Sequence, residues 1–122
     1  MKIKKKPLGT EGALFAVEGE LDAYTGPQLR EDLGQAVTEG VRFLVLDMSA
    51  VQYIDSVGLG ILVGAVKRTH EQQGGLAVIK PQANVLRVFE VSGTKDLLNV
   101  VGSLEEARSH LKGLPPDDGE GE

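Results

Sequence analysis

Short apolar runs alternate along this chain with longer segments in which apolar residues recur every three or four positions. A run of four or five apolar residues bounded by polar residues or glycine is typical of a strand buried in a sheet, whereas the longer spacing indicates a helix. The two patterns take turns after an initial pair of strands. The predicted strands lie around 4–6 and at 13–17, 43–46, 76–79 and 97–101, and the predicted helices at 25–39, 56–73, 81–93 and 103–113.

This order of elements predicts an α/β domain with a mixed, mostly parallel sheet of four to five strands and about four helices, because strands separated by helices pair in parallel. We expect the domain to occupy residues 1–113. Residues 114–122 consist of Pro, Gly and acidic residues with a single Leu. Such a segment cannot bury enough apolar surface to offset the entropy lost on ordering, so we expect a disordered acidic tail.

Composition narrows the classes of function. The net charge is −5, and the four acidic residues of the tail account for most of it, so the rest of the chain is nearly neutral and direct binding to nucleic acid is disfavoured. The chain has no Cys, which excludes disulfides, thiol catalysis and thiolate metal sites. No apolar stretch approaches the ~20 residues that span a bilayer. We therefore expect a cytoplasmic protein that neither enters a membrane nor carries a cofactor or metal.

The segment from Val45 to Gly60 holds the candidate chemistry. A buried strand ends there, a loop crosses its carboxyl edge, and a helix begins at Ser56; in open α/β sheets, sites gather at this edge. Ser56 is predicted to be the helix N-cap, with its hydroxyl close to free backbone N–H groups. A purely structural cap is one interpretation. The other is a phosphorylation site, because the helix dipole and the free N–H groups favour a phosphate there, while the neighbouring Asp55 adds further negative charge.

The helix that follows Ser56 has an unusual outer surface. At ~100° per residue its core stripe contains Leu59, Leu62, Val63 and Val66. Each glycine inside a helix costs about 1 kcal/mol relative to alanine, and this helix has three in seven positions. Two interpretations remain open, namely close packing against another part of the same chain and a docking surface for a partner protein with Ser56 at its rim. The residues of this candidate surface are Val57, Gly58, Gly60, Ile61, Gly64 and Arg68, with Ala65 beside them.

Four motifs, in order, resemble a known family. Residues 54–60, Ile-Asp-Ser-Val-Gly-Leu-Gly, resemble the Asp-Ser-Ser/Thr-Gly-Leu-Gly segment of STAS-domain anti-sigma factor antagonists. Residues 19–25 resemble the Gly-Glu-Leu/Ile-Asp loop of that family, 43–49 the strand before its phosphorylated loop, and 88–93 the end of its third helix. The resemblance spans about residues 10–112 and implies the STAS fold. Val57 departs from the motif, because many relatives carry a second Ser or Thr there, and this leaves Ser56 as its only hydroxyl.

The resemblance implies a partner-switching regulator of transcription. The unphosphorylated protein would bind an anti-sigma factor that is also a serine kinase of the histidine-kinase-like ATPase fold, and so release a sigma factor. Phosphorylation of Ser56 would end the interaction, and a metal-dependent serine phosphatase would restore it. Asp22 would belong to the phosphorylation region or contact the partner; the other interpretation is an ordinary turn aspartate. Asp55 would be a partner contact.

Two other functions are compatible with a serine at a helix start or with a STAS fold. A hydrolase would need a base near Ser56, but His70 lies 14 residues along the same helix, about 21 Å away. The chain also has no Gly-x-Ser-x-Gly elbow, so we expect no enzyme activity. His110 lies on the last, charged helix. STAS domains also serve as scaffold subunits of stress-sensing assemblies and as accessory subunits of lipid or anion transporters. That alternative stays open.

Overall fold

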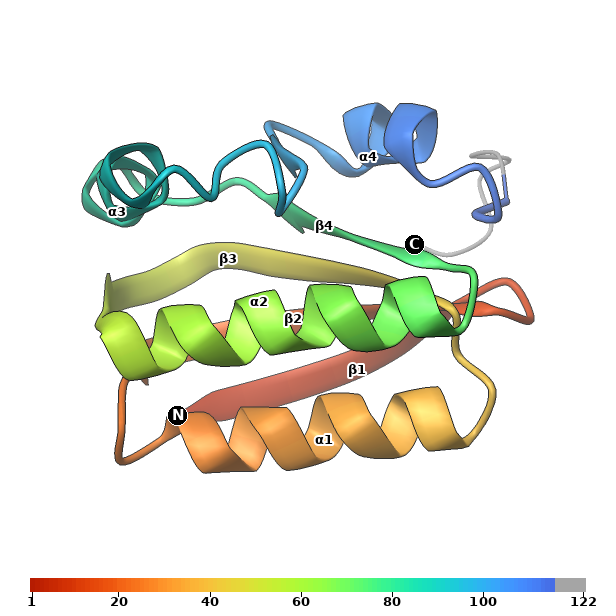
Figure 1. The fold of residues 1–122 in the computed structure, drawn as a ribbon, viewed down its shortest axis with the longest axis horizontal. Helices are drawn as coiled ribbons and strands as arrows, with labels where there is room; N and C mark the ends of the chain where they lie inside the picture. The colour runs from red at the N-terminus through yellow and green to blue at the C-terminus, as the bar shows by residue number, and fades with distance from the viewer. Residues whose placement is uncertain (116–122) are drawn as a thin grey trace.

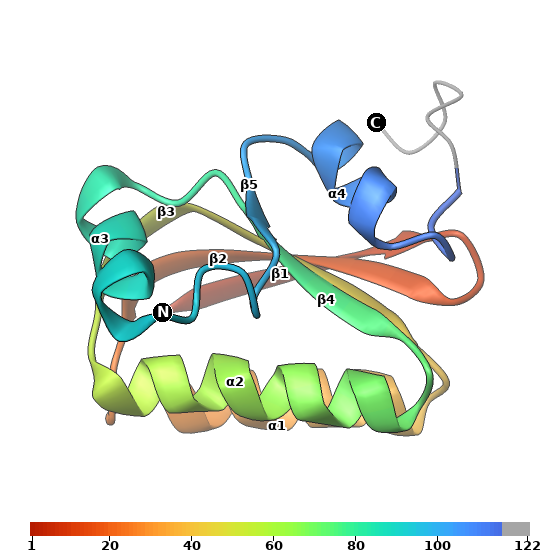
Figure 2. The ribbon, with the colours of Figure 1, turned by 45° about the horizontal axis from the view of Figure 1, so that its top comes forward.

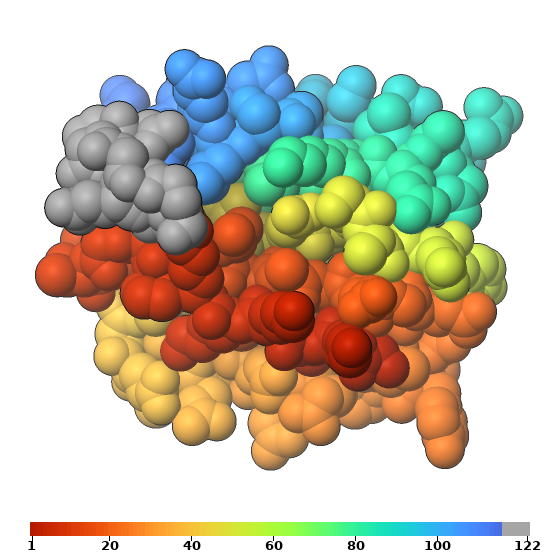
Figure 3. Space-filling view, turned by 180° about the vertical axis from the view of Figure 1, so that it is seen from behind, coloured from red at the N-terminus to blue at the C-terminus, as the bar shows by residue number. Residues whose placement is uncertain are grey.

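The structure is a computed structural model that describes residues 1–115. Its strands form one five-stranded sheet in the order β1-β2-β3-β4-β5 (Figure 1). β1 pairs with β2 antiparallel and all other neighbours are parallel, so the predicted mixed, mostly parallel sheet is confirmed. β1 is an edge strand, and it lies at the surface in the view from behind (Figure 3). The bounds are β1 Lys2–Leu8, β2 Gly12–Leu21, β3 Phe43–Ile54, β4 Gly75–Ile79 and β5 Val100–Val101.

The helices cover the sheet from both sides. α1 (Gly26–Thr38) and α2 (Ser56–Glu71) lie side by side on one face (Figures 1 and 2). α4 (Leu104–His110) packs against β4 and β5 on the other face, and α3 (Ala83–Ser92) packs beside β3. Because helices cover both faces, alternate residues of a central strand enter two different cores, and its sequence is a continuous apolar run. In β3, Leu44 and Leu46 join the core under α1 and α2, whereas Phe43 and Val45 join the core under α4.

β3 is longer than the sequence predicts. We expected a strand at 43–46 followed by a loop, but β3 continues to Ile54. β2 remains paired with it as far as Leu21 opposite Ile54, which supplies the backbone partners for a polar stretch. On the other side β4 ends opposite Asp47. Beyond that point the side-chain amides of Gln82 and Asn84 donate hydrogen bonds to β3 carbonyl groups, at 2.9 Å and 2.8 Å.

The packed chain also extends past the predicted boundary at residue 113. Leu114 is only 8% exposed and belongs to the core under α4. The Arg108 Nε atom donates a hydrogen bond of 2.7 Å to the Pro115 carbonyl. Leu114 and Pro115 are therefore part of the domain and not of a disordered tail. The remainder of the predicted acidic tail, 116–122, lies outside the described residues.

Candidate functional site: the amino end of α2 and the α1–α2 groove

Asp55 caps α2, and Ser56 is the first residue inside the helix. The Asp55 backbone is extended, and its Oδ1 atom accepts a hydrogen bond of 2.9 Å from the Gly58 N–H. The prediction that Ser56 is the cap is therefore wrong by one residue, because the carboxylate of Asp55 already takes the orphan N–H that a cap satisfies. Ser56 is exposed, and its hydroxyl has no hydrogen-bond partner among residues 1–115. Its side chain is left free for another role.

The loop after β2 meets this helix start. Asp55 Oδ2 accepts a hydrogen bond from the Ala23 N–H at 3.2 Å, and the Asp55 N–H donates to the Leu21 carbonyl at the same distance. Asp22 Oδ1 accepts hydrogen bonds from the N–H groups of Tyr24 and Thr25, each 2.9 Å long. The Thr25 N–H is the main reason that the pKa of the Asp22 carboxyl lies below its ordinary value. Asp22 thus shapes its own turn, and its contact with a partner stays a prediction.

α1 covers part of the α2 surface that was predicted to face a partner. Ile61 and Ala65 are only 8% and 6% exposed, and Ile61 packs against Gly26 of α1. The prediction that Ile61 lies on a face away from the core is therefore wrong. Two parallel strand–helix–strand units place α1 and α2 as neighbours on one side of the sheet, and the spacing within α2 alone does not show this.

The three glycines of α2 do not share one explanation, because one is closely packed within the chain and two are open. A Cβ atom on Gly58 would overlap the Leu21 carbonyl oxygen, so this glycine permits close packing within the chain. Gly58 is buried, and the structure gives no reason to count it as surface. A Cβ atom on Gly60 or Gly64 would have no neighbouring atom within 4 Å. Packing within the described residues therefore does not account for these two glycines.

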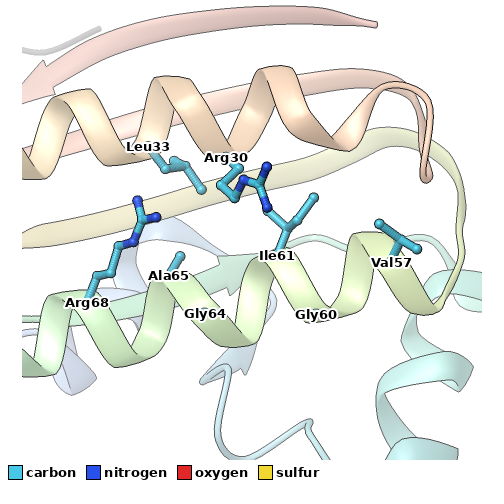
Figure 4. A pocket seen from close by; sticks show the side chains of 8 residues that line it. All are labelled: Arg30, Leu33, Val57, Gly60, Ile61, Gly64, Ala65 and Arg68. Carbon is cyan, nitrogen blue, oxygen red and sulfur yellow. The ribbon is translucent and has the colours of Figure 1, made fainter.

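A groove of about 320 Å³ runs between α1 and α2 (Figure 4). It brings together five of the residues that the sequence predicted as partner-binding. Sequence reasoning missed the contribution of α1, because nothing within α2 indicates which helix lies beside it. The lining residues are Val57, Gly60, Ile61, Gly64, Ala65 and Arg68 from α2, with Arg30 and Leu33 from α1.

The two histidines considered as a hydrolase base, His70 and His110, do not form a catalytic site with Ser56. His70 lies near the far end of the continuous helix α2, and His110 is the last residue of α4, on the opposite face of the sheet. Within residues 1–115 no three His, Asp or Glu side chains are grouped so that they could hold a metal ion. Among residues 1–115, every helix is too short or too polar to span a bilayer.

Residues 4–107 match the family model of the STAS domain. The chain belongs to the STAS domain family. Within this family it is 36% identical over 101 residues to the anti-sigma-B factor antagonist of Listeria monocytogenes, which covers 82% of this chain and 88% of that protein. It is 38% identical over 84 residues to the anti-sigma-B factor antagonist of Staphylococcus aureus, covering 69% of this chain and 78% of that protein.

The STAS fold is also shown by solved structures. The unphosphorylated form of the anti-sigma factor antagonist SpoIIAA superimposes with a TM-score of 0.79 at 21% identity, covering 94% of this chain and 100% of that one. The five-stranded sheet and four helices formed by residues 1–115 of this chain therefore match the predicted STAS architecture. Together with the two relatives, this confirms the resemblance to STAS-domain anti-sigma factor antagonists that the four sequence motifs indicated.

Proposed function

We propose that this STAS domain is an anti-sigma factor antagonist whose binding is switched off by phosphorylation of Ser56. The observation that carries the proposal is that two adjacent residues at the start of α2 have different roles. Asp55 caps the helix, and the adjacent Ser56 hydroxyl is exposed and unbonded within the described residues. A kinase would therefore modify Ser56 without removing an interaction that holds the fold together.

Phosphorylation would change the surface and leave the fold intact. A phosphoserine carries about −1.5 to −2 charges near pH 7, and a helix amino terminus favours negative charge. Ser56 adjoins Val57, which is 45% exposed. The loop after β2, which is hydrogen-bonded to Asp55, carries Tyr24, which is 93% exposed. A partner that buries these side chains would have to desolvate the phosphate. The switch would act by charge and bulk at the interface.

The relatives named as anti-sigma-B factor antagonists supply the class of partner. The partner would be an anti-sigma factor and serine kinase of the histidine-kinase-like ATPase fold, and a metal-dependent serine phosphatase would reverse the modification. Such an exchange would take place in the cytoplasm. This chain would act as a binding protein and not as an enzyme.

The test is phosphorylation and binding with candidate anti-sigma kinases from the same organism. The purified protein is incubated with ATP, Mg²⁺ and each kinase, and intact mass and phosphosite mapping are measured for wild type, Ser56→Ala and the control Ser109→Ala on α4. We expect a single phosphate on Ser56, lost only in Ser56→Ala, and weaker kinase binding after modification. Kinase binding with the phosphate elsewhere would keep the partner and remove Ser56 as its control. Absence of binding to every kinase would favour a scaffold or transporter subunit.

A further inference from the structure

The groove between α1 and α2 combines an apolar floor with two arginines. Leu33, Ile61 and Ala65 form the floor and are almost fully buried, while Arg30 and Arg68 are exposed (Figure 4). The groove continues to Val57, beside Ser56, so it adjoins the proposed phosphorylation site. This continuity makes it a candidate for the body of the partner interface, with Ser56 at one end.

Both arginines lack an acidic partner in the described part of the chain. The ion pairs there involve Lys5, Arg42 and Lys95, but neither Arg30 nor Arg68. The Arg68 guanidinium lies over Gly34 of α1, in contact with a residue that has no side chain to pair with it. Among the described residues, no acidic side chain lines the groove. The groove is therefore positively charged, and its occupant should be acidic, because guanidinium groups bind carboxylates with well-defined geometry.

The shape of the groove favours a helix as this occupant. Gly60 and Gly64 lie one turn apart on α2 and leave its backbone open to approach. The groove lies between two neighbouring helices, and a third helix can pack into such a groove with its apolar face against the floor. The Arg68 guanidinium lies over Gly34, which is four residues after Arg30 on α1. Four residues of helix span about 6 Å, so acidic side chains one turn apart on the occupant would reach both arginines.

We propose that the α1–α2 groove receives a helix of the anti-sigma kinase that presents small or apolar residues flanked by acidic residues one turn apart. This inference rests on the proposed function, since it names the surface through which that partner binds. It also supplies a physical reason for the switch. Phosphate on Ser56 would place negative charge at the Val57 end of the groove, where it would repel an acidic helix.

The experiment measures kinase affinity for folded groove variants. Gly64→Leu fills the groove, and the double variant Arg30→Gln/Arg68→Gln removes its charge. Lys67 is exposed on the same helix and does not line the groove, so Lys67→Leu and Lys67→Gln are matched controls. Urea unfolding of each variant shows whether the domain is folded. We expect at least a tenfold loss of affinity for both groove variants, no more than a twofold change for the controls, and a flatter salt dependence for the double arginine variant.

The outcomes separate this inference from the proposed function. If the wild-type protein binds the kinase and the groove variants bind it equally well, the groove inference is wrong and the proposed function stands. If the wild type binds no anti-sigma kinase, both the groove inference and the proposed function are wrong. If native mass spectrometry instead finds a small anion bound to wild type and absent from the arginine variant, the groove is a ligand site and the assignment of a helix is overturned.

Discussion

The glycines of α2 allow a quantitative test of which positions are closely packed and which are open. Gly60 and Gly64 lie inside the helix with open space where a Cβ atom would stand. Replacing either with alanine removes the cost of glycine in a helix, about 1 kcal/mol, and adds no clash. Gly58 differs, because its Cβ atom would overlap the Leu21 carbonyl oxygen, a backbone atom that cannot move away cheaply.

The expected changes in unfolding free energy have opposite signs. Gly60→Ala and Gly64→Ala should each raise the stability by about 1 kcal/mol. Overpacking a core costs typically 1–3 kcal/mol, so Gly58→Ala, after the gain in helix propensity, should lower stability by up to about 2 kcal/mol. Urea unfolding followed by circular dichroism measures all three. For a slope of about 1–2 kcal/mol/M, each stabilising change moves the midpoint by roughly 0.5–1 M.

Two results would refute this reasoning. Destabilisation by Gly60→Ala or Gly64→Ala would mean that those positions are packed against something in the folded chain. A stability gain for Gly58→Ala equal to that of the other two would mean that the close contact with Leu21 does not exist. The slopes of the urea curves must also stay unchanged, because a change in slope would indicate an altered denatured state and not a packing effect.

The remaining predictions concern the two aspartates beside the site. Asp55→Ala should lower the unfolding free energy by about 1 kcal/mol or more, because it removes both hydrogen bonds of the carboxylate. Asp55→Asn should cost less, because its one oxygen can still cap the helix but cannot also accept from the Ala23 N–H. Ser56→Ala should change the unfolding free energy by less than about 0.5 kcal/mol, because Ser56 does not cap this helix. Urea unfolding distinguishes them, and an equal loss for Ser56→Ala would return the cap to the serine. For Asp22 the lowered pKa means that the unfolded state binds a proton more readily, so the charged carboxylate stabilises the fold above the ordinary value of 3.8 and this contribution disappears as pH falls through the lowered pKa. Wild type should therefore exceed Asp22→Asn in urea midpoint at pH 7, with the difference shrinking toward pH 3; a constant difference would point to an effect other than ionisation.

The sequence by itself determined the class of fold, and it singled out Ser56 as the proposed phosphorylation site. Apolar runs such as Phe43–Leu46 and the spaced apolar residues of the helices depend on local periodicity, and they predicted the order of strands and helices correctly. Ser56 was singled out because a short motif places it directly after a strand, and the position of a helix start depends on neighbouring residues alone. The cap was misplaced by one residue, since Asp and Ser are both favoured N-caps and only the observed hydrogen bond from the Gly58 N–H distinguishes them.

The tertiary structure decided everything that depends on which elements are neighbours. The polar end of β3 is a strand because β2 and the side chains of Gln82 and Asn84 satisfy its backbone, and no local pattern contains that information. Whether a glycine of α2 is buried or open depends on Leu21, a residue distant in sequence. The groove exists because α1 lies beside α2 and contributes Arg30 and Leu33. Periodicity gives each helix its faces, but packing against the sheet determines which face another protein can reach.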